Sequence, residues 1–254
     1  MRHHKVYQRG IIGLLIAALL FSIANLFADK SPLVFEQLTK SRLEDLRTAY
    51  EAIKDNVGPK TDEEQVVLLY HIGEQSADYD TMGEVIEQLK MLRKSNPNDA
   101  EITAYLGSAY ALRARDYPWQ GFYQIIPGPG FVRLGYTWKG VHLLNKAATE
   151  NDRNPIVRML RGMTFTRLPR LFGQFGTGLG DLTLLRGWIE DPNTNPQYVD
   201  ILKDPAFRGD VYFRLAEAHW LDGNEADARR FFAHAVEAAP AGSPIAIAAR
   251  EMVQ

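Results

Sequence analysis

The chain has 254 residues, of which 31 are Asp or Glu, 29 are Lys or Arg, and 46% are hydrophobic. These proportions are those of an ordinary folded protein and exclude global disorder. The absence of cysteine excludes disulfide scaffolds, thiolate zinc sites, cysteine nucleophiles, iron–sulfur clusters and the lipid-bearing Cys of a bacterial lipoprotein.

The charge is unevenly distributed along the chain. Arg2, Lys5 and Arg9 are the only formal charges before Asp29. Without those three positive charges, the net charge of -2 becomes -5 for residues 29–254. Because nucleic-acid binding depends on positive charge that neutralises phosphates, we expect no nucleic-acid partner.

Residues 1–28 combine a basic stub with an apolar run from Ile11 to Phe27. This pattern predicts a signal peptide, cleaved after Ala24 or Ala28, or an N-terminal membrane anchor that touches the membrane through residues 10–28. The run is slightly shorter than the roughly 20 apolar residues that span a bilayer, so both alternatives stay open. Either one sends the remaining chain outward, because the positive flank stays cytoplasmic. We expect a bacterial protein that is periplasmic, or anchored in the inner membrane and facing the periplasm.

Residues 29–61 are predicted to form a leading helix and a linker. Ser31 is a suitable cap and Pro32 suits the first helical position, and we expect the helix to run to about Val57. From there on, apolar residues recur at spacings of three and four without sustained alternation. This periodicity predicts an all-α fold.

The clearest pattern is a helix hairpin over residues 209–242. Its large, small and aromatic positions are, in order, Tyr212, Leu215, Ala216, His219, Ala228, Phe232, Ala235 and Pro240. This order resembles the tetratricopeptide repeat (TPR) family, although His219 stands where the family usually has Tyr. In such a hairpin, small residues lie where the two helices approach closely.

Weaker copies of the pattern cover 66–99, 100–152 and 155–192. In the second of these, the closing helix is predicted at Tyr136–Glu150, after an inserted loop at 115–135. The resemblance implies a right-handed solenoid of antiparallel helix pairs over 62–254, with about four repeats, two of them irregular. Residues Ser243–Gln254 are predicted to form a capping helix, which such a stack needs.

The resemblance also implies a concave groove lined by the first helix of each pair. The positions it assigns to this partner-binding groove are Tyr70, Glu74, Ser108, Phe213, Glu217 and Trp220, with Val67, Ala77, Glu101, Ala104, Ala111 and Asp210 beside them. Carboxylates and aromatic rings together favour a peptide or a basic segment of a partner protein. The alternative is that the chain's own insertion fills part of this groove.

The inserted loop 115–135 is rich in aromatic residues and turn formers. Its contact surface is predicted from Trp119, Phe122, Tyr123 and Phe131. Long loops without periodicity are usually functional or disordered, and the aromatic content argues against disorder. The loop is therefore either a satellite of the core or a lid over the groove.

Arginines cluster between Arg153 and Arg170 without an intervening acid. A possible anion patch consists of Arg158, Arg161, Arg167 and Arg170. The alternative is that these side chains pair with acidic helices elsewhere, since charge runs mostly form solvated faces. The glycines between Leu168 and Asp181 match no nucleotide-binding spacing, so we interpret them as a tight turn between closely packed helices.

The sequence predicts no catalytic residue, no metal site and no cofactor. The histidines are scattered, and neither a G-x-S-x-G elbow nor an H-E-x-x-H motif is present. We therefore expect a non-catalytic exported scaffold that mediates protein–protein interaction in a membrane-associated transport or envelope-assembly complex. One alternative is a small-molecule binding protein accessory to a solute transporter, with the aromatic insertion as its lid. An enzyme is a weaker alternative, and assembly of several copies of the chain is also possible.

Overall fold

The computed structural model describes residues 33–56, 58–118 and 127–253. The predicted export segment 1–28, the cap at Ser31, and the loop residues Trp119, Phe122 and Tyr123 lie outside these ranges. All regular elements within them are helices, so the all-α prediction is confirmed for this part of the chain. None of its helices is long and apolar enough to cross a membrane.

The first half of the described chain forms five long helices. They are α2 (Leu33–Ile53), α3 (Pro59–Ser76), α4 (Tyr79–Ser95), α5 (Ala100–Arg115) and α6 (Pro127–Glu150). The second half alternates α-helices with short 3-10 helices and turns. Its elements are α7 (Pro155–Arg167), η2 (Arg170–Phe172), α8 (Phe175–Glu190), η3 (Pro192–Thr194), η4 (Pro196–Tyr198), α9 (Val199–Lys203), α10 (Pro205–Leu221), α11 (Glu225–Ala238) and α12 (Pro244–Val253).

Short polar side chains begin several of these helices. Each accepts a hydrogen bond from a backbone N–H of the first turn, which has no partner inside the helix. The caps of α4, α5, α7, α10 and α11 are Asp78, Asp99, Asn154, Asp204 and Asn224.

Two helix boundaries differ from the predicted ones. The leading helix ends at Ile53 rather than near Val57. At this end, the side-chain amide of Gln65 donates hydrogen bonds of 2.7 and 2.8 Å to the carbonyl oxygens of Ile53 and Asn56. Helix α6 begins at Pro127 rather than at Tyr136, so residues 127–135 of the expected loop are helical. Prolines are tolerated in a first helical turn because its N–H groups have no intrahelical acceptor.

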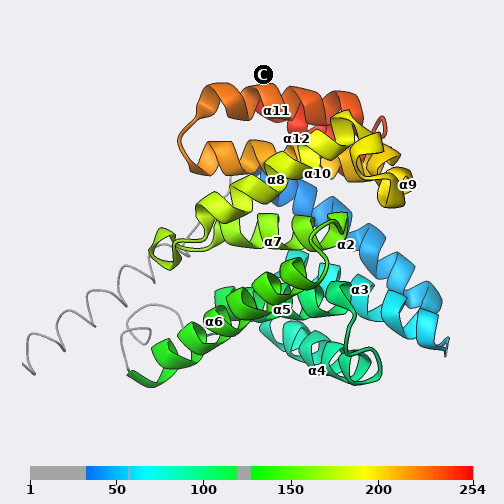
Figure 1. Ribbon diagram of the computed structural model, residues 1–254, viewed down its shortest axis with the longest axis vertical. Coiled ribbons are helices and arrows are strands. Elements are labelled where there is room, and N and C mark those ends of the chain that lie inside the picture. The colour runs from blue at the N-terminus through cyan, green and yellow to red at the C-terminus, as the bar shows by residue number, and fades with distance from the viewer. Residues whose placement is uncertain (1–32, 57, 119–126, 254) are drawn as a thin grey trace, which may run out of the picture.

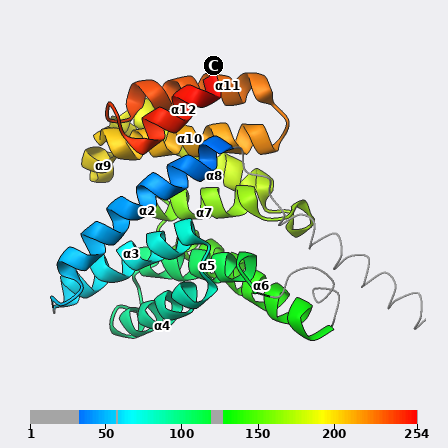
Figure 2. The same ribbon diagram turned by 180° about the vertical axis from the view of Figure 1, so that it is seen from behind.

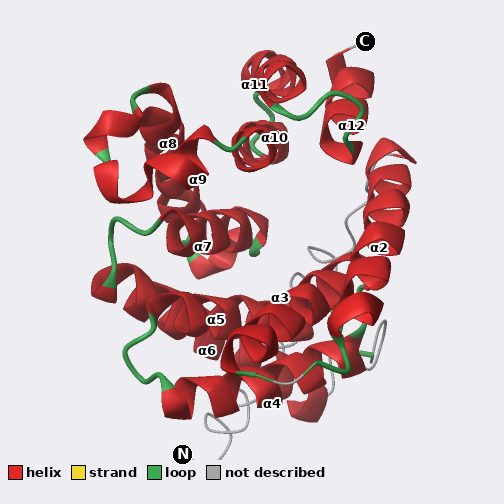
Figure 3. Ribbon diagram, turned by 90° about the vertical axis from the view of Figure 1, so that its right-hand side faces the viewer, coloured by secondary structure: helices red, strands yellow, loops and turns green. Residues whose placement is uncertain are grey.

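The helices pack as consecutive pairs: α3 with α4, α5 with α6, α7 with α8, and α10 with α11 (Figure 1). The first helices of these pairs also pack on one another in chain order, α3 on α5, α5 on α7 and α7 on α10. Helix α2 contacts both α3 and α12, so it joins the first pair to the end of the chain (Figures 2 and 3).

Two apolar cores share α7 as a common wall. The first core lies between α3 and α7 and includes Leu160, and the second extends from α7 to α12 and includes Met159. These adjacent residues point to different sides of α7 because neighbouring helical positions are about 100° apart. Helix α7 therefore fixes how the two halves meet.

Small residues allow the paired helices to approach closely. A Cβ on Gly107 would lie 2.9 Å from the Leu144 backbone nitrogen, and one on Gly140 would lie 2.7 Å from the Gly107 carbonyl oxygen. Gly162 and Gly178 make the same kind of contact between α7 and α8. The glycine-rich stretch before Asp181 thus lets two helices pack closely at Gly178, but most of it is not the predicted tight turn, because α8 begins at Phe175.

We expect Gly178→Ala to lower the free energy of unfolding by about 1–3 kcal/mol, because the added methyl group overpacks the α7–α8 contact. Its Cβ would lie 2.8 Å from the Phe165 Cβ and 2.9 Å from the Thr166 backbone nitrogen. The matched control is Gly180→Ala in the same helix, where nothing lies within 4 Å. The control should raise stability by up to about 1 kcal/mol through helix propensity. Urea unfolding followed by circular dichroism measures both, and equal effects would refute the proposed close contact.

Candidate functional site

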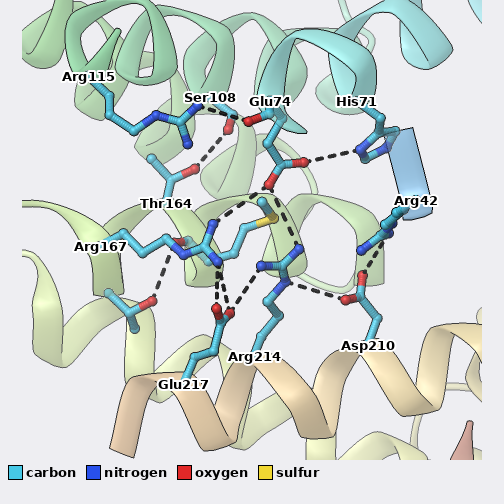
Figure 4. A network of polar contacts seen from close by, with 12 residues as sticks. Arg42, His71, Glu74, Ser108, Arg115, Thr164, Arg167, Asp210, Arg214 and Glu217 are labelled. Carbon is cyan, nitrogen blue, oxygen red and sulfur yellow. Dashed lines mark hydrogen bonds and ion pairs between the residues drawn. The ribbon is translucent and has the colours of Figure 1, made fainter. Parts of the chain in front are cut away.

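A network of charged side chains lies where α3, α7 and α10 meet (Figure 4). At its centre is Glu74 of α3, which is only 5% exposed. Its Oε2 lies 3.3 Å from His71 Nδ1, while Oε1 lies 3.7 Å from Arg167 Nη1 and 3.8 Å from Arg214 Nη2. One carboxylate therefore attracts cations from two helices that are distant in sequence.

Arg214 of α10 is buried among three carboxylates. Its Nη1 donates a 3.0 Å hydrogen bond to Glu217 Oε2, and its Nε lies 3.3 Å from Asp210 Oδ1. Arg167 donates to both oxygens of Glu217, at 2.7 and 2.9 Å. The other Asp210 oxygen faces Arg42 of α2, at 3.8 Å. The network thus joins α2 to the helices that it crosses.

The network continues to the end of α5 through a backbone contact. Arg115 Nη2 donates a 2.9 Å hydrogen bond to the Glu74 carbonyl oxygen, and the same guanidinium pairs with Asp116. Beside it, three buried hydroxyls connect α3, α5 and α7. The Tyr70 and Ser108 oxygens are 2.7 Å apart, and the Ser108 and Thr164 oxygens are 2.8 Å apart.

The ion pairs balance the formal charge of the network. Its cations are Arg42, Arg115, Arg167 and Arg214, and its carboxylates are Glu74, Asp116, Asp210 and Glu217. These four cations and four carboxylates carry no net charge. Buried charges persist only when they are compensated in this way.

The hydrogen bond from His71 and the charges of two arginines decide the protonation of Glu74. Burial alone would raise its pKa, but the hydrogen bond from His71 and the charges of Arg214 and Arg167 outweigh burial and hold the pKa well below its usual range. The carboxylates around Arg214 likewise outweigh the effect of burial and raise its pKa above the usual value. Glu74 therefore stays ionised near neutral pH and is poorly suited to general acid–base chemistry there.

Ser108 and His71 do not form the hydrogen-bonded pair that would activate a serine nucleophile. Ser108 is hydrogen-bonded to Tyr70 and Thr164, while the polar contact of His71 is with Glu74. A serine nucleophile requires a base within hydrogen-bond reach. The arrangement instead cross-links helices.

The structure brings most of the predicted groove residues together in the interior. Tyr70, Glu74, Ser108 and Phe213 are buried, and Glu217 pairs with Arg167 and Arg214, whereas Trp220 is exposed at the end of α10. In this conformation the inner helices meet through their own side chains. A partner-binding role for these positions stays a prediction.

Every arginine of the predicted anion patch is paired with a carboxylate of the chain. Arg158 and Arg161 both donate to Asp181, which is buried on α8, at 2.6–2.9 Å. Arg167 pairs with Glu217 as described above, and Arg170 donates a 2.8 Å hydrogen bond to Asp222. These four side chains would have to break ion pairs to bind an external anion.

Phe131, the described member of the predicted insertion surface, belongs to a wider apolar edge. We define this apolar edge as the exposed side chains of Phe131, Val132, Trp138, Leu171, Trp220 and Leu221. Two contacts connect its parts. The Trp138 ring lies 5.5 Å from that of Phe172 in η2, and Arg170 Nη2 donates to the Leu221 carbonyl oxygen at 3.3 Å. The edge thus runs from the start of α6 over η2 to the end of α10, which lie on one side of the molecule (left in Figure 1).

Sequence reasoning missed Arg214, although a signal was present. Asp210 precedes it by four residues and Glu217 follows it by three, and these spacings put all three side chains on one helix face. An arginine between Phe213 and Leu215 in an apolar stretch must also be paired if it is buried. Its pairing across to Glu74 has no such local signal.

Within the described ranges, no group of three or more His, Asp or Glu side chains is placed to hold a metal ion. No model of a known protein family matches the sequence, and no curated protein or solved structure matches it either. The resemblance to TPR proteins therefore stays a prediction from the residues.

We expect Arg214→Met to lower the free energy of unfolding by about 3–5 kcal/mol, because it leaves buried carboxylates without their shared cation. The matched control is Arg170→Met, whose ion pair with Asp222 is about half exposed on both sides. An exposed pair of this kind contributes at most about 1 kcal/mol. Urea unfolding measures both losses, and equal losses would contradict the importance of the network.

The depressed pKa of Glu74 predicts a pH-dependent contribution to stability. The ionised group contributes fully above its ordinary pKa of about 4.5, and this contribution is lost as the pH falls toward the lower pKa of the folded state. The difference in unfolding free energy between the wild type and Glu74→Gln should therefore shrink between pH 5 and pH 3. Urea unfolding across this range tests it, and a constant difference would contradict the ionised assignment.

Proposed function

We propose that this protein is an exported, non-catalytic helical scaffold that binds a protein partner in a membrane-associated assembly. Export is supported by the basic stub and apolar run of residues 1–28. A binding role is supported by the TPR-like pattern of residues 209–242 and by the apolar edge.

The apolar edge is the observation that carries this proposal. Of the ten large hydrophobic side chains that are exposed in the described residues, six belong to it, and Phe131 and Trp138 are more than half exposed. A contiguous exposed apolar patch on a soluble surface usually marks an interaction site. Trp and Phe are also the side chains that protein interfaces favour.

The interior of the protein supports the proposal that binding takes place at the apolar edge. The charged groups that face one another from α3, α7 and α10 are used in pairs within the chain, as Glu74, Arg167 and Arg214 illustrate. They hold helices in place, whereas most of the large hydrophobic side chains that are exposed in the described residues lie at the edge. A partner bound there would contact α6, η2 and α10 at once.

Site-specific photo-crosslinking in intact cells tests the proposal. A photoreactive phenylalanine analogue replaces Trp138, and the matched control carries it at Met91 of α4, which is 59% exposed but outside the edge. We expect a discrete protein adduct from position 138 and none from position 91, because Trp138 belongs to the apolar edge and Met91 does not.

The adduct mass and the solution mass of the purified chain separate the possible partners. An adduct of twice the chain mass, together with a dimer in solution, would replace the foreign partner with a second copy. The same adducts from both positions, or none from either, would overturn the edge as the binding surface.

A further inference from the structure

We propose that a cluster of cations and tyrosines between α4, α5 and α6 binds a phosphate group, carried by a small phosphate compound or by a lipid headgroup. We call it the tyrosine–cation cluster and define it as Lys90, Arg113, Lys139, Tyr79, Tyr110 and Tyr136. It lies apart from the Glu74 network and does not depend on the proposed scaffold function.

Arg113 of α5 is held by aromatic rings instead of carboxylates. Its guanidinium carbon lies 4.4 Å from the Tyr79 ring centre and 5.5 Å from that of Tyr136. The guanidinium also lies against the backbone of Gly83, where an added Cβ would be 2.7 Å from Nη1. A glycine at this place in α4 therefore leaves the space that the side chain occupies.

Within the described residues, no acceptor meets the hydrogen-bonding edge of Arg113. Its Nε is buried, and no hydrogen-bond partner or ion-paired carboxylate for it is found in this part of the chain. Aromatic rings interact with the faces of a guanidinium, but its N–H groups point outward in its plane. A buried donor without an acceptor calls for an explanation such as a bound water or ion.

A second cation, Lys139, lies against the ring of Tyr110, which neighbours Tyr136. Lys139 Nζ lies 4.3 Å from the centre of the Tyr110 ring, and that ring stacks on Tyr136 at 5.9 Å. Glu87 and, to a smaller extent, Tyr110 raise the pKa of Lys90, whose ammonium donates a hydrogen bond to Glu87. Arg113 and Lys139 thus lie against one pair of stacked tyrosines.

The cluster carries more positive than negative charge. Glu87 is exposed, and its carboxylate accepts a 2.6 Å hydrogen bond from Lys90. Lys90 first, and then Arg113 and Lys139, lower the pKa of Glu87, so all three cations act on this one carboxylate. Three cations against one anion leave an excess of two positive charges, in a region of the sequence that is acidic overall.

The chemistry of these groups favours phosphate over other anions. A guanidinium presents paired N–H donors that match two phosphate oxygens, and ammonium groups add charge without a fixed direction. A phosphate monoester carries close to two negative charges near pH 7, which matches the excess of the cluster. A single carboxylate would leave one of these charges uncompensated.

Titration of the full chain with inorganic phosphate, followed by isothermal calorimetry, tests the site. We expect saturable binding that sodium chloride of equal ionic strength does not reproduce. Arg113→Gln and Lys139→Gln should each weaken it at least about tenfold, since each removes a charged contact. Lys139 is exposed, so its substitution tests the site even if Arg113→Gln impairs folding.

The matched control is Arg208→Gln on α10, because the Arg208 Nε is also buried without a hydrogen-bond partner. This variant should bind phosphate as the wild type does. A second measurement uses phosphatidylcholine vesicles with and without phosphatidic acid, and co-sedimentation that depends on Lys139 would identify a lipid headgroup as the source. Binding of phosphate alone would identify a small compound. Binding of neither probe, or equal weakening by all three substitutions, would overturn the proposal and leave a purely structural stack.

Discussion

The arrangement of the helices depends on keeping the buried Glu74 carboxylate ionised. An isolated carboxylate in this position would be strongly destabilised by loss of water, so cations must accompany it. Those cations, Arg167 and Arg214, come from α7 and α10, and each is itself held by Glu217. Buried ion pairs contribute little net stability compared with apolar packing, but breaking one is costly. The network therefore penalises other arrangements of α3, α7 and α10 more than it strengthens the observed one.

This constraint determines which surfaces are left for binding. The polar groups of the inner helices are paired with one another, and Arg42 of α2 forms a further ion pair with Asp210 of α10. Under the proposed scaffold function, a partner meets a shape that is already set, so less conformational entropy is lost on binding than with a mobile surface. The apolar edge suits this role because α6, η2 and α10 that carry it are tied together by the Trp138–Phe172 and Arg170–Leu221 contacts.

Local patterns in the sequence predicted the local structure well. Spacing and small residues located the hairpins, and the residues Ala216, Ala228 and Phe232 predicted to lie inside 209–242 are buried on α10 and α11. The predicted start of α6 was wrong because a Pro-Gly-Pro-Gly sequence is compatible with a first helical turn as well as with a loop. The pairing of Glu74 with Arg167 and Arg214 was beyond reach, since these partners follow it by 93 and 140 residues and periodicity describes one helix at a time.

Arg214 and Arg113 show two ways of burying the same guanidinium. Both have a buried Nε without a well-directed hydrogen bond. Around Arg214, carboxylates on three sides compensate the charge, so an added anion would be repelled. Around Arg113, tyrosine rings shield the faces but supply no negative charge, so the cation remains attractive to an anion. Burial of arginine by itself therefore does not distinguish a structural position from a binding position. The distinguishing property is whether the chain itself supplies a carboxylate within ion-pair distance, and at Arg113 the described chain does not.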